Sequence, residues 1–270
     1  MILRLRPERM ANMLNIDLTG KVAVVTGAAG QLGRTMARTL ARCGADVVVH
    51  YNRSQEMAES LAEDLRAMGR RAAAISGDVG KADDVMRLRD ETVRLLGTAD
   101  ILVNNAVAQY SWTSVLEQPV EDYESQFESC VLQNVLMAKA FVPAMIAKGR
   151  GGRIVGINTE CAMQCFPSQS AYVAGKRGMD GVLRVLAKEI GKYGITVNQV
   201  APGWTISDRD RAADTEVNES SESYVKSVPL GRRGDDQEIA NVVAFLASDL
   251  ASYITGAYVP VCGGNVMPCI

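Results

Sequence analysis

Short runs of Val, Ile and Ala alternate with longer amphipathic segments along this chain, and this alternation limits the fold more than any other feature. Strands that are buried on both faces read as continuous apolar runs, whereas helices that cover a sheet repeat their apolar residues every three to four positions. The pattern therefore predicts an α/β fold, a doubly wound parallel sheet of about seven strands with helices on both faces. The expected strands are residues 21–26, 46–51, 71–76, 99–104, 152–158, 195–200 and 257–261.

The segments between these runs have the apolar spacing of helices. They lie near residues 31–43, 54–68, 82–96, 119–148, 170–192 and 236–248. Ser54 and Asp235 are the expected N-caps of two of these helices. Because no linker or low-complexity segment divides the chain, residues 17–270 are expected to form a single domain. Residues 1–16 have no apolar run of signal-peptide length and are expected to be a flexible N-terminal extension.

One polar stretch, residues 204–228, interrupts the alternation. It contains the run SDRDRAADTEVNESSES, in which acidic residues outnumber basic ones. Such a segment cannot bury itself, and it follows a predicted strand end, which is where parallel sheets bind ligands. We expect a lid over a ligand site, with a solvated surface loop as the alternative.

The charge balance argues against nucleic acids and membranes as partners. The 270 residues carry a net charge of -2, and no cluster of five or more Lys and Arg residues occurs. No run reaches the ~18 apolar residues of a membrane span. A small molecule is therefore the expected partner.

The six cysteines follow no metal or disulfide pattern. No CxxC pair occurs, and with His50 as the single histidine the usual zinc spacings cannot be assembled, so no metal site is expected. Reduced thiols in a cytoplasmic protein are the simplest interpretation. A redox pair of Cys161 and Cys165 is the alternative.

A glycine loop, TGAAGQLG, follows the first predicted strand and precedes a predicted helix. Gly27, Gly30 and Gly33 allow a tight turn and let an anion approach the backbone N–H groups at the helix N-terminus. A loop at this place in a βαβ unit is typical of a Rossmann-type dinucleotide site. We expect it, with Gln31 and Leu32, to bind the pyrophosphate of NAD(P).

The end of the second predicted strand distinguishes between the two nicotinamide cofactors. Sites for NAD have an acid there that binds the ribose 2'-hydroxyl. This chain has Asn52, Arg53 and Ser54 instead. Since Arg offers a fork of donors and Ser a hydroxyl to a 2'-phosphate, NADP(H) is expected over NAD(H). The alternative is that Arg53 only marks a helix start.

Seven motifs, in order, resemble those of the short-chain dehydrogenase/reductase family over residues 17–265. They are DLTGKVAVVTGAAGQLG, GDV (77–79), ILVNNA (101–106), GRIVGIN, AYVAGK, ITVNQVAPG and VPLGRRGDDQEIANVVAFLASDLASYITGAYVPVCGG. The resemblance implies an oxidoreductase that acts on CH–OH or C=O groups with NAD(P). It also implies one catalytic NAD(P)-binding domain over residues 17–270 and a homodimer or homotetramer.

Tyr172 and Lys176 lie four apart in a predicted helix, so their side chains leave the same face. In the family this tyrosine exchanges a proton with the substrate oxygen, and the lysine holds the nicotinamide ribose. Because a nearby ammonium favours phenolate, the pKa of Tyr172 is expected to fall from its usual value of about 10 toward working pH.

Two other positions of the family's catalytic set carry unusual residues. Thr159 stands where the family has the serine that bonds the substrate carbonyl; its hydroxyl offers the same donor and acceptor, and its methyl narrows the pocket. Cys130 stands where the family has an asparagine that supports a water relay to the lysine, and a thiol binds water weakly. Asn134, one helical turn later, is a candidate substitute.

The resemblance also implies further cofactor contacts and a substrate pocket. The expected contacts outside the glycine loop and residues 52–54 are Asp78, Val79, Asn105, Ala106, Val107, Tyr172, Lys176, Pro202, Gly203 and Thr205. The expected pocket residues are Gln109, Tyr110, Trp112, Glu160, Cys161 and Trp204. Glu160 indicates a polar or cationic substrate rather than a long acyl chain, unless its carboxylate points to solvent.

The leading interpretation is an NADP(H)-dependent carbonyl reductase, or the reverse alcohol dehydrogenase. A 3-oxoacyl-thioester reductase is the first alternative. The second is a cofactor-binding redox sensor or scaffold with little turnover, because several residues depart from the family pattern in one site. Besides Cys130 and Thr159 these are Gln31, which replaces the middle glycine of the loop, and Val107, which replaces the glycine after NNA.

Overall fold

The centre of the fold is one sheet of seven parallel strands in the order β3-β2-β1-β4-β5-β6-β7. The computed structural model describes residues 15–212 and 219–267, so most of the expected extension 1–16 and residues 213–218 of the expected lid lie outside it. The strands are β1 (Val22–Val25), β2 (Asp46–Tyr51), β3 (Ala72–Ser76), β4 (Ile101–Asn104), β5 (Gly152–Ile157), β6 (Ile195–Pro202) and β7 (Tyr258–Val261). The predicted fold class is confirmed, because every predicted apolar run coincides with one of these strands, although β6 continues two residues beyond its run to Pro202.

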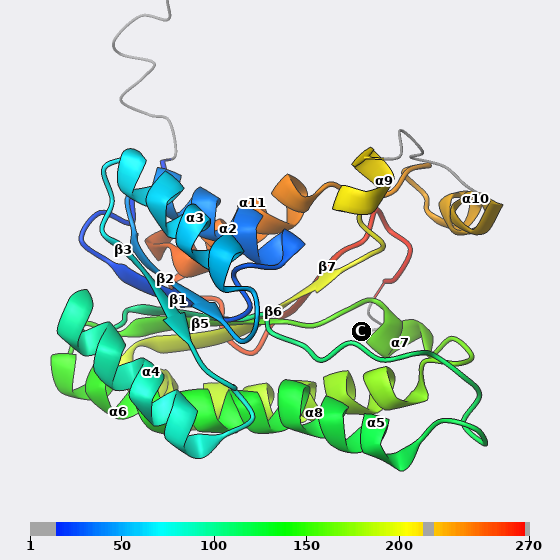
Figure 1. Cartoon of the computed structure of the whole chain (residues 1–270), viewed down its shortest axis with the longest axis horizontal. Helices are drawn as coiled ribbons and strands as arrows, with labels where there is room; N and C mark the ends of the chain where they lie inside the picture. The colour runs from blue at the N-terminus through cyan, green and yellow to red at the C-terminus, as the bar shows by residue number, and fades with distance from the viewer. Residues whose placement is uncertain (1–14, 213–218, 268–270) are drawn as a thin grey trace, which may run out of the picture.

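Helices cover both faces of the sheet (Figure 1). One face packs against α2 (Gln31–Arg42), α3 (Gln55–Ala67) and α11 (Asp236–Ala247). The other packs against α4 (Ala82–Leu95), α6 (Gln133–Lys148) and α8 (Ser170–Ile190). Each layer has its own apolar core, with Met36, Leu40 and Val243 on the first face and Leu88, Met137 and Leu183 on the second. Burial of these side chains on both faces explains why the strands read as unbroken apolar runs.

The segment predicted as one helix over residues 119–148 is interrupted. It consists of α5 (Val120–Gln126), a π-helical turn η1 (Phe127–Leu132) and α6. Among the described residues, only Val120–Lys148 forms a helix long and apolar enough to cross a membrane. Half of its most apolar window is buried inside the protein, where α6 packs against α4, α8 and β4. It is therefore built as a core helix of the second layer.

The two expected N-caps differ in the structure. The Asp235 carboxylate accepts a hydrogen bond from Gln237 N at 2.8 Å, and Glu238 Oε2 accepts one from Asp235 N at 2.8 Å, which completes a capping box for α11. Ser54 stands at the predicted N-cap position of α3, but its hydroxyl makes no capping bond. Its backbone, at φ -92° and ψ 64°, is not in the extended conformation that turns a capping hydroxyl toward the helix.

The carboxyl ends of β1 and β4 lie side by side in the sheet. From this pair, the sheet continues through β2 and β3 on one side and through β5, β6 and β7 on the other. Doubly wound sheets bind ligands at this point. The short elements α7 (Cys161–Gln164), α9 (Asp208–Ala212) and α10 (Glu219–Ser227) follow β5 and β6 at the same edge, on the right in Figure 1. The fold thus gathers the ends of several strands and the described residues of segment 204–228 (204–212 and 219–228) around one region.

Candidate active site

The glycine loop after β1 is shaped by backbone contacts that exclude side chains. Gly27 has φ +61°, and a Cβ on it would lie 3.0 Å from Ala106 Cα. A Cβ on Gly33 would lie 2.3 Å from the Gly27 carbonyl oxygen, which no real contact permits. Helix α2 starts at Gln31 without a side-chain cap on Gly30. The first N–H groups of α2 can therefore bind an anion, and the loop fits the pyrophosphate of a dinucleotide.

Two polar residues fix this loop to its neighbours. The Thr26 hydroxyl donates to Gln133 Oε1 at 2.7 Å and accepts from the N–H groups of Asn105 and Ala106 at 2.9 and 3.0 Å. His50 accepts from Gly27 N–H through Nδ1 at 3.2 Å. Neither Thr26 nor Gln133 was among the sequence-predicted site residues, because their partners are far away in the chain and only the folded sheet brings them together.

The expected 2'-phosphate and adenine contacts lie at the ends of β2 and β3. Asn52, Arg53 and Ser54 are exposed, and among the described residues Arg53 has no acidic partner at ion-pair distance. Asp78 holds its own loop, since its Oδ1 accepts from Gly80 N at 3.0 Å, and Val79 is buried. An unpaired guanidinium at this edge suits a phosphate.

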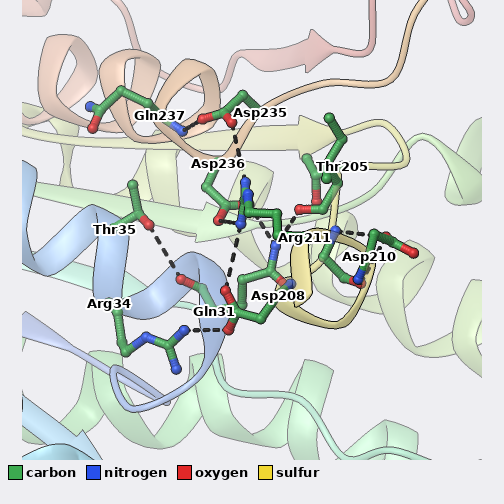
Figure 2. A network of polar contacts seen from close by, with 12 residues as sticks. Gln31, Arg34, Thr35, Thr205, Asp208, Asp210, Arg211, Asp235, Asp236 and Gln237 are labelled. Carbon is green, nitrogen blue, oxygen red and sulfur yellow. Dashed lines mark hydrogen bonds and ion pairs between the residues drawn. The ribbon is translucent and has the colours of Figure 1, made fainter. Parts of the chain in front are cut away.

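The side chain of Gln31 makes its hydrogen bonds outside the glycine loop, although Gln31 replaces a glycine of that loop. Its Nε2 donates to the Ile206 carbonyl and to Asp236 Oδ1, both at 2.7 Å, and its Oε1 accepts from Asp208 N at 3.1 Å. Figure 2 shows these bonds beside the ion pair of Arg34 with Asp208. The amide thus ties α9 to the first turn of α2.

A second set of ion pairs holds α9 on its other side (Figure 2). Arg211 pairs with Asp235 and with Asp236, both at 3.1 Å, and Asp210 accepts from the Ser207 hydroxyl at 2.7 Å. Arg233 pairs with Asp210 at 2.7 Å and donates to the Thr205 carbonyl at 2.6 Å. Helix α9 is therefore fixed to α2 and α11, whereas the role of residues 204–228 as a lid stays a prediction.

Thr159, Tyr172 and Lys176 meet at the ends of β5 and α8. The side chains of Thr159 and Tyr172 line the same cavity, and the Thr159 hydroxyl lies close enough to lower the pKa of Tyr172. Lys176 is buried; its Nζ donates to the Ile157 carbonyl at 2.6 Å and lies 5.7 Å from the centre of the Tyr172 ring. The expected fall in the pKa of Tyr172 is not found, because burial raises that pKa, and the Thr159 hydroxyl only opposes the rise. Burial also lowers the pKa of Lys176, which weakens its pull on the phenol.

Cys130 lies in the π-helical turn η1, buried beside this group, and it acts electrostatically on the pKa values of both Tyr172 and Lys176. Asn134 makes one bond at each end of its amide. Its Nδ2 donates to the Cys130 carbonyl at 2.7 Å, and its Oδ1 accepts from Asn104 Nδ2 at 2.7 Å. One N–H and one lone pair of this amide are left for a water, so the role of Asn134 as a substitute for the missing asparagine stays a prediction.

A cavity of about 730 Å³ opens beside Thr159 and Tyr172. Residues from four segments line it: Ala108 to Trp112, Thr159 to Gln169, Gly203 to Thr205, and α10. Gln109, Glu160, Cys161, Trp204 and Thr205 all lie on its walls. Tyr224 of α10 also lines it and reaches over Gly203, where a Cβ would lie 2.6 Å from the phenol oxygen. Sequence reasoning missed Tyr224, which no strand end marks.

The thiols do not form the alternative redox pair. Cys161 and Cys165 are both free, and burial raises the pKa of Cys161, which disfavours its reactive thiolate. Within the described part of the chain, no group of three or more His, Cys, Asp or Glu residues is arranged to hold a metal ion.

Comparisons with known proteins place this geometry in a family. A family model described as Enoyl-(Acyl carrier protein) reductase matches residues 27–265. The chain is 36% identical over 247 residues to the 3-oxoacyl-[acyl-carrier-protein] reductase FabG of Staphylococcus epidermidis, which covers 92% of this chain and 99% of that protein. The chain belongs to the short-chain dehydrogenase/reductase family.

Other relatives match a similar share of this chain. The 3-oxoacyl-[acyl-carrier-protein] reductase of Synechocystis is 36% identical over 251 residues, 93% of this chain and 98% of that protein. A blue fluorescent protein from a metagenomic library in complex with NADPH has a TM-score of 0.86 and 33% identity over 93% of this chain and all of that one. A gluconate 5-dehydrogenase from Burkholderia cenocepacia in complex with NADP and tartrate has a TM-score of 0.85 and 29% identity, with 93% and 97% covered.

Membership of the short-chain dehydrogenase/reductase family makes this chain an oxidoreductase that acts on CH–OH or C=O groups with NAD(P). The tight turn at Gly27 and Gly33, where a side chain would clash with the backbone of residues 27, 28 and 106, leaves the first N–H groups of α2 open to the pyrophosphate of that nucleotide.

Proposed function

We propose that this protein is an NADP(H)-dependent carbonyl reductase, or in reverse an alcohol dehydrogenase, of a small diffusible substrate. One observation carries the proposal. The side chains of Thr159 and Tyr172 line one cavity of about 730 Å³, and the buried Lys176 ammonium lies 5.7 Å from the centre of the Tyr172 ring, behind that wall. Two hydroxyls at one wall can bind a substrate oxygen, and a phenol can exchange its proton.

The chain's own residues would divide the work. The glycine loop and the start of α2 bind the pyrophosphate, and Lys176 holds the ribose next to Tyr172. When bound, the nicotinamide supplies or accepts the hydride. Thr159 orients the substrate oxygen, and Tyr172 transfers the proton. Because burial raises the pKa of Tyr172, the phenol stays protonated at neutral pH and is set up to donate, which favours reduction of a carbonyl.

NADP(H) is supported over NAD(H) by the end of β2. The guanidinium of Arg53 is exposed and not engaged by any described acid, and no carboxylate stands at residues 52–54 to repel a phosphate. Two solved relatives are described as complexes with NADPH and with NADP.

A 3-oxoacyl-thioester reductase is the second candidate, because relatives 36% identical carry that name. The cavity favours the smaller substrate. Its walls carry Glu160 as the only charged side chain among the described residues, together with several aromatic rings, and these surroundings do not match a long aliphatic chain. Activity on a 3-oxobutyryl thioester far above that on simple ketones would reverse this preference.

The test is turnover of NADPH with a panel of ketones, and its loss in Tyr172→Phe. We expect kcat to fall by about 10²- to 10⁴-fold, the usual contribution of an acid that donates to the reacting oxygen, while NADPH affinity is unchanged. Tyr123→Phe is the matched control, since Tyr123 bonds Ser170 at 2.6 Å outside the cavity. Tight NADPH binding without turnover of any carbonyl would support the sensor or scaffold alternative, and an unchanged rate in Tyr172→Phe would refute the proposed acid.

We also propose that the chain forms a homodimer or homotetramer. A groove between α5, η1 and α8 is lined by Phe127, Val131 and Ala174, and Phe127 is 56% exposed, which a second copy would cover. Light scattering measures the mass directly, and a monomer would refute the proposal.

A further inference from the structure

The substrate cavity carries a negative charge that no cation on its walls balances. Glu160 is the only ionisable acid or base among the described lining residues other than tyrosine and cysteine, and only 3% of it is exposed. The cations next to these walls have partners of their own. Lys176 donates to the Ile157 carbonyl, and Arg233, whose guanidinium lies 4.6 Å from the centre of the Trp204 ring, pairs with Asp210 at 2.7 Å.

Neutral groups lie beside the Glu160 carboxylate and do not neutralise it. Asn265 Nδ2 donates to Glu160 Oε2 at 3.2 Å, and the Tyr224 hydroxyl, which accepts from Trp204 N at 2.8 Å, lies close enough to lower the pKa of Glu160. Burial raises the pKa of Glu160 despite these groups. A buried carboxylate without a counter-charge is unfavourable, so a bound cation would gain the interaction that the protein leaves open.

Aromatic rings surround this carboxylate. Trp112 stacks on the Tyr172 ring with centroids 6.0 Å apart, and Trp204 meets Tyr224 edge to face at 5.4 Å. Phe166 and Tyr110 complete the walls, which therefore contain both tryptophans of the chain. Faces of Trp and Tyr attract ammonium groups, and an aromatic cage with one carboxylate binds them well.

The segment that follows the lining residues Ala108 to Trp112 in the chain has the same sign. Between Val107 and Ala138 the chain has no Lys, Arg or His. The acids of this stretch are Glu117, Glu121, Asp122, Glu124 and Glu128. Such a field concentrates cations near the cavity and repels anions.

We propose that the substrate bears an amine or quaternary ammonium close to its carbonyl or carbinol carbon, and that Glu160 is the residue that binds this cation. The substrate class is then amino ketones and amino alcohols. This inference rests on the proposed function for the reaction, but the recognition of the cation can be measured without turnover. Acyl chains lack the charge, and sugar acids carry the opposite one.

The test uses two ketones of the same shape. Trimethylammonio-acetone carries the charge, and 4,4-dimethylpentan-2-one replaces the nitrogen by carbon. Binding is followed by tryptophan fluorescence of the cofactor-free protein, since Trp112 and Trp204 both line the cavity. We expect the ammonium ketone to bind at least about tenfold more tightly than its neutral isostere, and to weaken as ionic strength rises.

Glu160→Gln keeps the shape and removes the charge. It should abolish the preference for the ammonium ketone, a loss of about tenfold or more, and should change the neutral ketone by less than about threefold. Glu160→Asp, which keeps the charge, should restore part of the preference, and Glu117→Gln, on the exposed segment outside the cavity, should leave most of it. Equal binding of the two ketones to the wild type, or an equal loss of both in Glu160→Gln, would overturn the proposal and make Glu160 a support for Tyr224.

Kinetics separate this proposal from the proposed function. The ammonium group also activates the carbonyl, so the rates of the two ketones differ even without Glu160. For each protein we therefore take kcat/KM of the ammonium ketone divided by kcat/KM of the neutral ketone. The decisive quantity is this ratio in the wild type divided by the same ratio in Glu160→Gln. A ratio well above one, carried by KM, supports cation binding. Selective binding of the ammonium ketone without any turnover would refute the carbonyl-reductase function and leave the cation site standing.

Discussion

His50 is the only histidine of the chain, and the structure predicts an unusual titration for it. It is 1% exposed; Nδ1 accepts from Gly27 N–H, and Nε2 donates to the Gly77 carbonyl at 3.0 Å. A backbone N–H can only donate, so this pairing requires the neutral ring with its proton on Nε2. Burial, opposed by the Gly77 carbonyl and by Asp78 and Asp84, lowers the pKa of His50 from 6.5 to about 4.

The lowered pKa makes stability depend on pH in a defined window. The unfolded chain takes up this proton as the pH falls below 6.5, whereas the folded protein takes it up only near pH 4. The unfolded state therefore binds more protons between these values, and the folded state loses free energy as the pH falls through the window. From pH 7 to pH 5 the loss from this one group is about 2 kcal/mol. That is a large part of the about 5–15 kcal/mol by which domains are stable.

The assay is urea unfolding of the wild type and of His50→Gln at pH 7 and pH 5, at one protein concentration. The variant is expected to be less stable at pH 7, because its amide replaces both ring bonds imperfectly. Between the two pH values the wild type should lose about 2 kcal/mol more than the variant, since contributions from carboxylates are common to both. Equal losses, or an imidazole NMR signal that titrates near pH 6.5 in the folded protein, would refute the reasoning.

Three further variants test the cofactor and proton-transfer residues. Arg53→Ala should weaken NADPH about tenfold and NADH by less than about twofold, as measured by cofactor titration, because a charge-assisted bond to the 2'-phosphate is lost; Arg38→Ala, whose arginine pairs with Asp64, is the control, and an equal effect on both cofactors would contradict the assignment. Gln31→Gly restores the family's residue and removes three bonds to residues 206, 208 and 236, so trypsin should cut after Arg211 at least about tenfold faster, and an unchanged rate would show that α9 is held without Gln31. Cys130→Asn should raise kcat several-fold, because an amide binds a relay water better than a thiol, whereas Cys130→Ala should not; a loss in both would mean that the site is built around the thiol.

The strands and their burial could be predicted from the sequence, because each strand is covered by helices on both faces of the sheet. "DVVVHY" and "ITVNQV" read as continuous apolar runs, and they form β2 and β6. The π-helical turn at Phe127–Leu132 could not be predicted in this way. A single wide turn shifts the apolar face by only one position, and the spacing of apolar residues before and after it still reads as one helix.

Residues at strand ends were predictable, and residues brought in by distant segments were not. Thr159 and Asn105 each follow a strand of a parallel sheet, so their place at the carboxyl edge follows from the pattern alone. Tyr224 reaches Glu160 from a polar segment 64 positions later in the chain, and no local spacing records that contact. The direction of the shift in the pKa of Tyr172 was missed for a related reason. Tertiary packing decides how deeply the phenol is buried, and the effect of this burial on the pKa outweighs the effect of one nearby ammonium.

The departure at Gln31 gains its meaning from the other end of segment 204–228. Gln31 holds α9 through the Ile206 carbonyl and the Asp208 N–H, while Tyr224 of α10 lies beside Glu160 and accepts from Trp204 N at 2.8 Å. Gln31 of the glycine loop therefore contacts the part of segment 204–228 that precedes residues 213–218. The wall of the substrate cavity contacts the part that follows them. A cation bound at Glu160 acts on the carboxylate beside Tyr224 of α10, and a nucleotide bound at the glycine loop acts next to the amide that positions α9. A ligand bound at either site would then change the position of α9 or α10, which belong to one segment. The affinities for cofactor and substrate should therefore depend on each other.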